Sequence, residues 1–181
     1  MTYRNVVAAV VRALASDVLN SAGGCDFEPR VQSARIPGAL SGKDARLLDD
    51  GWVRGRLHSQ LTGDQYTALV AFYSGDFASK IDAAQAMAKR VKSPAPERFI
   101  TCATVTWAAP KRQGVDGKRS TSVLPAGWYC LDNWCDDPIS VKTQERWRRE
   151  IRKALKAEVD AALEIAQDVL EADGLLICDV A

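Results

Sequence analysis

The stretch that decides the fold is PISVKTQERWRREIRKALK, residues 138–156. Pro138 interrupts the preceding chain, and Ser140 can cap a helix by accepting a hydrogen bond from a backbone N–H. Apolar residues then recur every three or four positions, which is the spacing of one buried helix face. They are Trp147, Ile151, Leu155, Val159, Ala162, Ala166 and Val169. The pattern predicts one long helix that ends at Gly174.

A second stripe of the same predicted helix is cationic. It consists of Lys142, Arg146, Arg149, Lys153 and Lys156, again at helical spacing. With Arg148 and Arg152, residues 138–156 hold seven cations against two carboxylates and carry +5. The whole chain is +1, which leaves −4 for everything else. Such a local concentration of positive charge is typical of a surface that faces phosphate.

The first turns of this helix carry side chains that can recognise DNA. A helix in the major groove reads bases with its first turns, where Gln can bond adenine, Arg guanine, and Thr a thymine methyl or a phosphate. The residues of this kind are Ser140, Lys142, Thr143, Gln144 and Arg146. The order of residues 139–147 is similar to the second half of a helix-turn-helix, although a cationic face that meets only water is the plainer interpretation.

The remainder of the chain predicts further helices, so the expected fold is mainly α. Helical spacing covers residues 2–19, 43–61, 62–73 and 77–91, and Thr62-Gly63-Asp64-Gln65 is a capping-box pattern. Residues 98–107 fit either a strand or a helix, and we assign them to a helix. In residues 43–61 the side chains expected to pack inward are Leu47, Leu48, Trp52 and Leu57. The aromatic residues of 128–134 are expected to join the core.

Residues 20–43 differ from their surroundings, because Gly and Pro break them repeatedly. Long segments of this kind are either functional or disordered, and both interpretations stay open. We expect two parts: an N-terminal helix with this irregular segment over residues 1–61, and a helical DNA-binding domain over residues 62–181.

Bulk composition excludes several classes of protein. The chain has 47% apolar residues, no signal-peptide pattern and no run long enough to span a membrane, so a cytoplasmic globular protein is expected. Cys130 and Cys135 are spaced like a metal-binding pair, but no second pair completes a zinc site, and His58 is the single histidine. We expect no metal or cofactor. No motif for an enzyme stands out.

Taken together, the order of these segments resembles the phage late-gene antitermination proteins of the Q group. The features that carry the resemblance are the broken N-terminal segment, the 62–73 and 81–91 helices, Leu124-Pro125, Asp136-Asp137 and the basic helix. The resemblance covers most of the chain, but it lacks the zinc-binding cysteine cluster found in one branch of the group.

The resemblance implies a DNA-binding transcription antiterminator. Such proteins bind double-stranded DNA at a promoter element, load onto RNA polymerase and permit terminator read-through by narrowing the RNA exit channel. On this basis the DNA-binding residues are expected to be Ser140, Lys142, Thr143, Gln144, Arg146, Arg148, Arg149 and Lys153. The segment beside nascent RNA is expected to contain Arg30, Arg35 and Lys43.

A helical protein–protein adaptor is the alternative function. On that interpretation the cations of the last helix meet acidic side chains of a partner. Salt dependence separates the two, because DNA binding weakens steeply with salt. Which helix would precede the reading helix also stays open, with residues 81–91 and 128–134 as the two candidates.

Overall fold

A computed structural model of the chain describes residues 3–21, 42–113, 120–121 and 123–176. This part of the chain is mainly helical, as predicted. The α-helices are α1 (Val6–Ser21), α2 (Gly42–Gln60), α3 (Gly63–Tyr73), α4 (Phe77–Ala88), α5 (Glu97–Ala108) and α6 (Val141–Ala172). Two short antiparallel strands, β1 (Arg112–Gln113) and β2 (Ser120–Thr121), follow α5, and then two 3-10 helices, η2 (Ala126–Tyr129) and η3 (Leu131–Asn133).

Local sequence signals explain where several helices begin and end. Thr62 and Gln65 form the predicted capping box, in which each side chain satisfies a backbone N–H of the other residue. Ser140 caps α6 by accepting a hydrogen bond from the N–H of Thr143 at 3.4 Å. Gly174 has a φ of +68°, a conformation that costs glycine little, and it follows directly on the end of α6.

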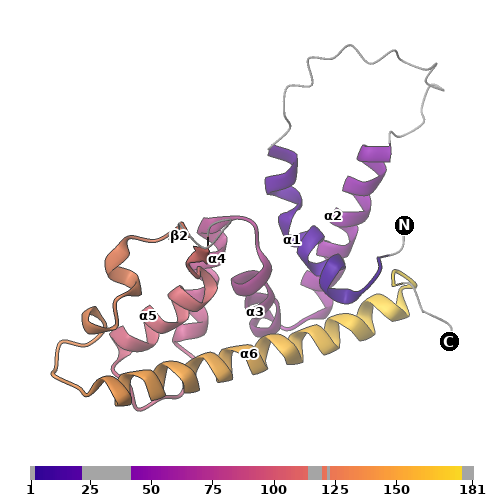
Figure 1. Cartoon of the computed structure of the whole chain (residues 1–181). Coiled ribbons are helices and arrows are strands. Elements are labelled where there is room, and N and C mark those ends of the chain that lie inside the picture. The colour runs from indigo at the N-terminus through magenta and orange to yellow at the C-terminus, as the bar shows by residue number, and fades with distance from the viewer. Residues whose placement is uncertain (1–2, 22–41, 114–119, 122, 177–181) are drawn as a thin grey trace, which may run out of the picture.

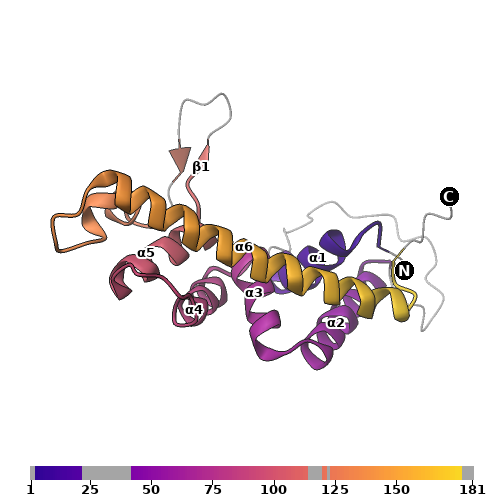
Figure 2. The same cartoon turned by 90° about the horizontal axis from the view of Figure 1, so that it is seen from below.

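Helix α6 runs the length of the molecule. Helices α1, α2, α3 and α5 pack along it, and α4 packs on α3 and α5. Its 32 residues correspond to about 48 Å. Figure 1 shows α1 and α2 as a pair at the yellow C-terminal end of α6, with α3, α4 and α5 along the rest. Figure 2 shows α6 crossing in front of the others from one end of the molecule to the other. The opposite side of α6 therefore faces away from the bundle.

The predicted apolar stripe of α6 forms one side of the core. Ile151, Leu155, Val159, Ala162 and Ala166 are all buried, and Leu170 completes the stripe where Val169 was expected. At the N-terminal end of α6 the core is aromatic. The ring of Phe99 lies 5.1 Å from that of Trp134 and 5.6 Å from that of Trp147, both nearly perpendicular. Buried Trp134 confirms a core role for part of the 128–134 cluster.

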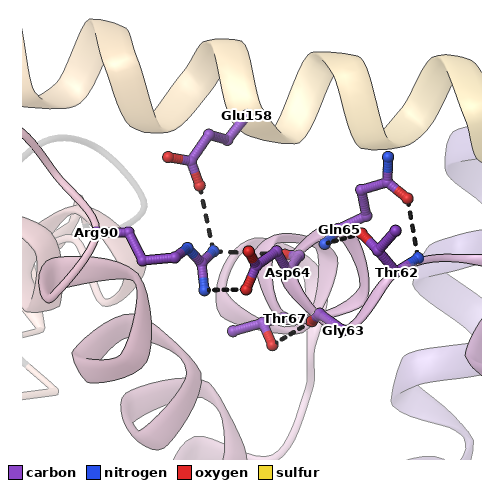
Figure 3. A network of polar contacts seen from close by, with 7 residues as sticks. All are labelled: Thr62, Gly63, Asp64, Gln65, Thr67, Arg90 and Glu158. Carbon is purple, nitrogen blue, oxygen red and sulfur yellow. Dashed lines mark hydrogen bonds and ion pairs between the residues drawn. The ribbon is translucent and has the colours of Figure 1, made fainter.

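Arginine–carboxylate pairs tie the helices together. Arg90, just beyond α4, contacts Asp64 of α3 at 2.9 Å and Glu158 of α6 at 3.3 Å (Figure 3). Arg56 of α2 donates two 2.8 Å hydrogen bonds to Asp173 at the end of α6. These contacts fix the second half of α6 against three other helices.

A buried polar network joins the N-terminus to the same end of α6. The hydroxyl of Tyr3 donates to Asp50 at 2.7 Å, and Arg12 binds the same carboxylate with two hydrogen bonds. The N–H of Tyr3 also donates to the carbonyl of Leu175 at 2.7 Å. Burial and the adjacent Asp50 raise the pKa of Tyr3, which keeps its hydroxyl protonated as a donor.

Two predictions about the inward faces are wrong. Leu48 and Trp52 of α2 are 60% and 49% exposed. The buried positions of α2 are Asp50, Val53 and Leu57, so residues 48 and 52 lie on another side of the helix. Of the other two residues predicted to pack inward, Leu57 is buried and Leu47 is half-buried. The four predicted residues do not share one helix face, and α2 packs against α1 with the face of Val53 and Leu57 buried.

The helix-turn-helix part of the fold prediction is not confirmed. Of the described residues between α5 and α6, none forms an α-helix directly before α6; only the short strands and two 3-10 helices lie there. The core contains residues from both predicted parts, such as Val10 and Ile151, and the division at residue 61 stays a prediction. Among the described helices, none combines the length and the apolar character needed to cross a bilayer.

Candidate nucleic-acid interface

The cationic stripe of α6 lies on the side of the helix away from the bundle. Its five residues, Lys142, Arg146, Arg149, Lys153 and Lys156, are all exposed. They follow one another at three- and four-residue intervals, so they form one straight row along the first half of the helix. The packed residues of the same half, Ile151 and Leu155, lie on the opposite side.

These cations have no carboxylate partner among the residues that the structure describes. Ion pairs form elsewhere, for example at Arg12, Arg56, Arg90 and Arg98, and not at a residue of the stripe. A row of exposed cations without such partners produces a positive potential that extends into solvent. The first half of α6 is therefore an available surface for a polyanion.

The head of the helix only partly matches its predicted role. Lys142 and Arg146 are exposed, as base-reading or phosphate-binding residues need to be. Ser140 and Thr143 are engaged in capping, and their hydroxyl oxygens lie 2.9 Å apart in a hydrogen bond. Capping explains why these two residue types stand here without any reference to DNA.

Gln144 requires a correction. Its side chain is 4% exposed and its amide nitrogen donates to the carbonyl of Ile139 at 3.3 Å. A glutamine in this position cannot reach a base edge. The sequence suggested exposure because Gln is polar, but position 144 belongs to the buried face that Ile151 and Leu155 continue about two and three turns later.

Two further arginines lie beside the stripe rather than on it. Arg148 and Arg152 are half-buried and, with Glu145 and Arg149, line an open hollow of about 310 Å³. Burial, together with the positive charge of Arg148, lowers the pKa of Arg152. The Nε atom of Arg152 is buried and has no hydrogen-bond partner. Arg152 was absent from the predicted site, although its four-residue spacing from Arg148 was a visible signal.

Two of the three residues predicted for the RNA channel, Arg30 and Arg35, lie outside the described residues. The third, Lys43, lies in the first turn of α2.

A second cavity lies on the other side of the aromatic core. It has a volume of about 730 Å³ between α5 and the 3-10 helices, and its lining includes Arg98, Cys102, Trp128 and Asn133. Desolvation raises the pKa of Cys102 and of Cys135, which makes both thiols less reactive at neutral pH. In the described residues, no group of three or more His, Cys, Asp or Glu side chains is placed to hold a metal ion.

Comparisons with known proteins add no assignment. No protein-family model, curated protein or solved structure matches the chain. The function is therefore argued from the geometry and charge of α6.

Proposed function

We propose that the protein binds double-stranded DNA through the first half of α6. The single observation that carries this proposal is a row of five exposed cations on the side of α6 away from the bundle, none of which pairs with a carboxylate that the structure describes. Phosphate contacts of this kind set the affinity and orientation of a DNA-binding protein. Arg146 is the remaining candidate for direct base recognition, because Gln144 is buried.

The wider role follows from the resemblance to the antitermination proteins. We infer that the DNA-bound protein loads onto RNA polymerase in the cytoplasm, acts without a metal or cofactor, and permits read-through of terminators. Nascent RNA would then lie beside residues 20–43. An antiterminator needs binding surfaces rather than catalytic groups, which fits a chain without an enzyme motif.

The first test is a salt series with duplex DNA and purified full-length protein. Binding by the wild type should weaken linearly on logarithmic axes as salt increases. A variant with Lys142, Arg146 and Arg149 changed to Ala should lose most of its affinity and show a slope shallower by about 0.9 for each lost phosphate contact. Absence of wild-type binding even at low salt would contradict the proposal.

The control comes from the same face of the same helix. Asp160→Asn, Glu164→Gln and Asp168→Asn remove three exposed charges from the second half of α6. These changes should leave DNA binding intact or strengthen it slightly, since they remove repulsion. Equal losses in both triple variants would indicate damage to α6 rather than loss of specific contacts.

Read-through tests the antitermination role separately. Replacing residues 22–41 by a short Gly/Ser linker keeps α1 and α2 complete and removes the segment assigned to the RNA channel. DNA binding should persist while terminator read-through is abolished. Read-through that survives the replacement would remove this segment from the mechanism.

A protein–protein adaptor is the second candidate function. It is favoured by Leu48 and Trp52, which are exposed one turn apart on α2 and can contact an apolar partner surface. An adaptor would show no steep salt-dependent binding to DNA. The salt series therefore decides between the two candidates.

A further inference from the structure

The hollow on the flank of α6 is built from one side of the helix. Glu145, Arg148, Arg149 and Arg152 line it, and their intervals of three, one and three residues place all four on neighbouring turns. Three guanidinium groups and one carboxylate give the lining a net charge of +2. The hollow is open and has a volume of about 310 Å³, the size of the smaller ligand pockets, which start at about 300 Å³.

The charges of Arg148 and Arg152 are not compensated inside the protein. Neither forms an ion pair with any residue that the structure describes. Arg12, Arg56 and Arg98 behave differently, since each meets a carboxylate. Like charges one turn apart repel each other, and partial burial removes the water that would otherwise screen them.

Arg152 also carries a buried donor without an acceptor. Its Nε atom is out of contact with solvent and has no hydrogen-bond partner. Leaving such a donor unsatisfied is costly, and the cost is larger for a charged group. The buried Nε stays out of reach of an anion in the open hollow, but the rest of this half-buried guanidinium group can donate to one, and the anion would compensate the charge of both arginines.

We propose that this hollow binds one phosphate group of a nucleic-acid backbone, held between Arg148 and Arg152. This assignment rests on the proposed function, because Arg149 belongs both to the hollow and to the exposed stripe. Guanidinium groups bind phosphate oxygens through paired N–H donors, and two arginines on one phosphate present more donors than one lysine. Glu145 opposes any anion, but the net charge of the lining remains positive.

The phosphate site itself is tested with inorganic phosphate as the probe. A ligand that binds only the folded state raises the melting temperature. Phosphate, compared with chloride at equal ionic strength, should raise the melting temperature of the wild type and should have no effect on Arg152→Met. Lys92→Met is the control, since it also removes one cation, at an exposed position that is not part of the lining of the hollow, and it should keep the full response.

Stability without phosphate provides a second measurement on the same variants. Arg152→Met should melt at or above the wild-type temperature in phosphate-free buffer, since it removes an uncompensated charge and an unsatisfied donor. A wild type that does not respond to phosphate, or an Arg152→Met variant that still does, would overturn the site. Clear destabilisation of Arg152→Met in phosphate-free buffer would make Arg152 a structural residue.

The slope of the salt series tests whether the phosphate belongs to DNA. If Arg148 and Arg152 share one phosphate, changing both to Met should reduce the slope by about 0.9, the value for one lost phosphate contact. Lys142→Gln with Lys153→Gln is the control pair, because their Cα atoms are about 16 Å apart along the helix and must contact separate phosphates. That pair should reduce the slope by about twice as much.

The outcomes distinguish the phosphate site at Arg148 and Arg152 from DNA binding by the first half of α6. An unchanged slope in the Arg148/Arg152 variant, with a reduced slope in the lysine pair, overturns the shared phosphate and leaves DNA binding standing. A slope reduced as much as in the lysine pair means that the two arginines contact separate phosphates. If the wild type does not bind DNA, the proposed function and the backbone assignment both fail. Loss of the phosphate response in Arg152→Met would then assign the hollow to free phosphate.

Discussion

The two halves of α6 belong to one continuous helix but differ in their charged residues. The first half is basic, and the second half is acidic and forms ion pairs with other segments. In residues 141–156 seven cations are present, and none is paired within the part of the chain that the structure describes. In the second half, Glu158 is paired with Arg90, and Asp173 at the C-cap is paired with Arg56. The exposed row of Lys142 to Lys156 continues along the same side of the helix as Asp160, Glu164 and Glu171.

The charges of the two halves therefore serve different purposes: carboxylates of the acidic half hold other segments of the fold, whereas cations of the basic half can bind a partner. In the acidic half of α6, Asp173 holds α2 through Arg56 and Glu158 holds the end of α4 through Arg90, and the N-terminal segment packs against the end of α6. The basic half packs through apolar and aromatic contacts, such as that between Phe99 and Trp147. Charges that are not needed for the fold can be directed at a partner. Removing charge should therefore affect stability at one end of α6 and binding at the other.

The largest effect on stability should come from the network beyond the acidic end. Asp50→Ala leaves the buried hydroxyl of Tyr3 without an acceptor and Arg12 without its carboxylate. Breaking a buried charged network costs about 3 kcal/mol, at the low end of the usual range because Arg12 is 39% exposed. Denaturant unfolding measures the change. In the basic half, Lys153→Gln should change the free energy of unfolding by less than about 0.5 kcal/mol. Similar losses in the free energy of unfolding for both variants would contradict the proposed difference between the two ends of α6.

The largest single-residue effect on binding should come from Arg146. Arg146→Ala should weaken specific DNA binding by about 1–3 kcal/mol if the side chain pairs with a guanine, and should weaken binding to random DNA less. Competition between a specific and a random duplex measures the difference. An equal loss on both duplexes would make Arg146 a phosphate contact.

A smaller effect is expected at Gln144, which the structure removes from the reading surface. Gln144→Met should leave DNA affinity unchanged and shift the free energy of unfolding by less than about 1 kcal/mol. The lost bond to Ile139 is offset because the unsatisfied amide oxygen is also removed. Titration with DNA and thermal unfolding measure the two quantities. A clear loss of DNA affinity would mean that Gln144 is accessible in the complex.

The smallest effect should be a pH-dependent one at the acidic end. The Arg56 guanidinium holds the pKa of Asp173 below its usual value through a hydrogen-bonded pair. A carboxylate whose pKa is lowered by folding stabilises the fold above its unfolded pKa, about 3.9, and this stabilisation is lost as the pH falls through the folded pKa. Wild type and Arg56→Gln should therefore differ at neutral pH and converge below about pH 4. Unfolding midpoints across this range test the pair, and a constant gap would exclude it.

Sequence periodicity located most of the helices because each depends on local signals. The capping box at Thr62, the cap at Ser140 and the glycine at 174 are read within a few residues of the helix ends they define. The inward faces were less predictable. Leu48 and Trp52 match a helical stripe, as do Val53 and Leu57, and only contact with a neighbouring helix decides which stripe is buried.

In the candidate site, too, some features follow from the sequence and others depend on packing. The exposed stripe from Lys142 to Lys156 follows from spacing and from the absence of apolar residues on that side. The burial of Gln144 and the half-burial of Arg152 do not, because each depends on what packs against the flanks of α6. A polar residue type indicates that the side chain prefers contact with water, but the packing of neighbouring segments decides whether that side chain is exposed.

By itself, the sequence determined a mainly helical protein with one long last helix whose first half is basic and second half acidic. These features depend on residue order within single helices, where local hydrogen bonds and side-chain spacing act over a few residues. The tertiary structure alone decided which charges are paired and which face solvent. Arg56 meets Asp173 across 117 positions of sequence, whereas the cations of α6 have no carboxylate partner in the described ranges of the chain. Such pairings arise only when distant segments meet, so no local pattern contains them.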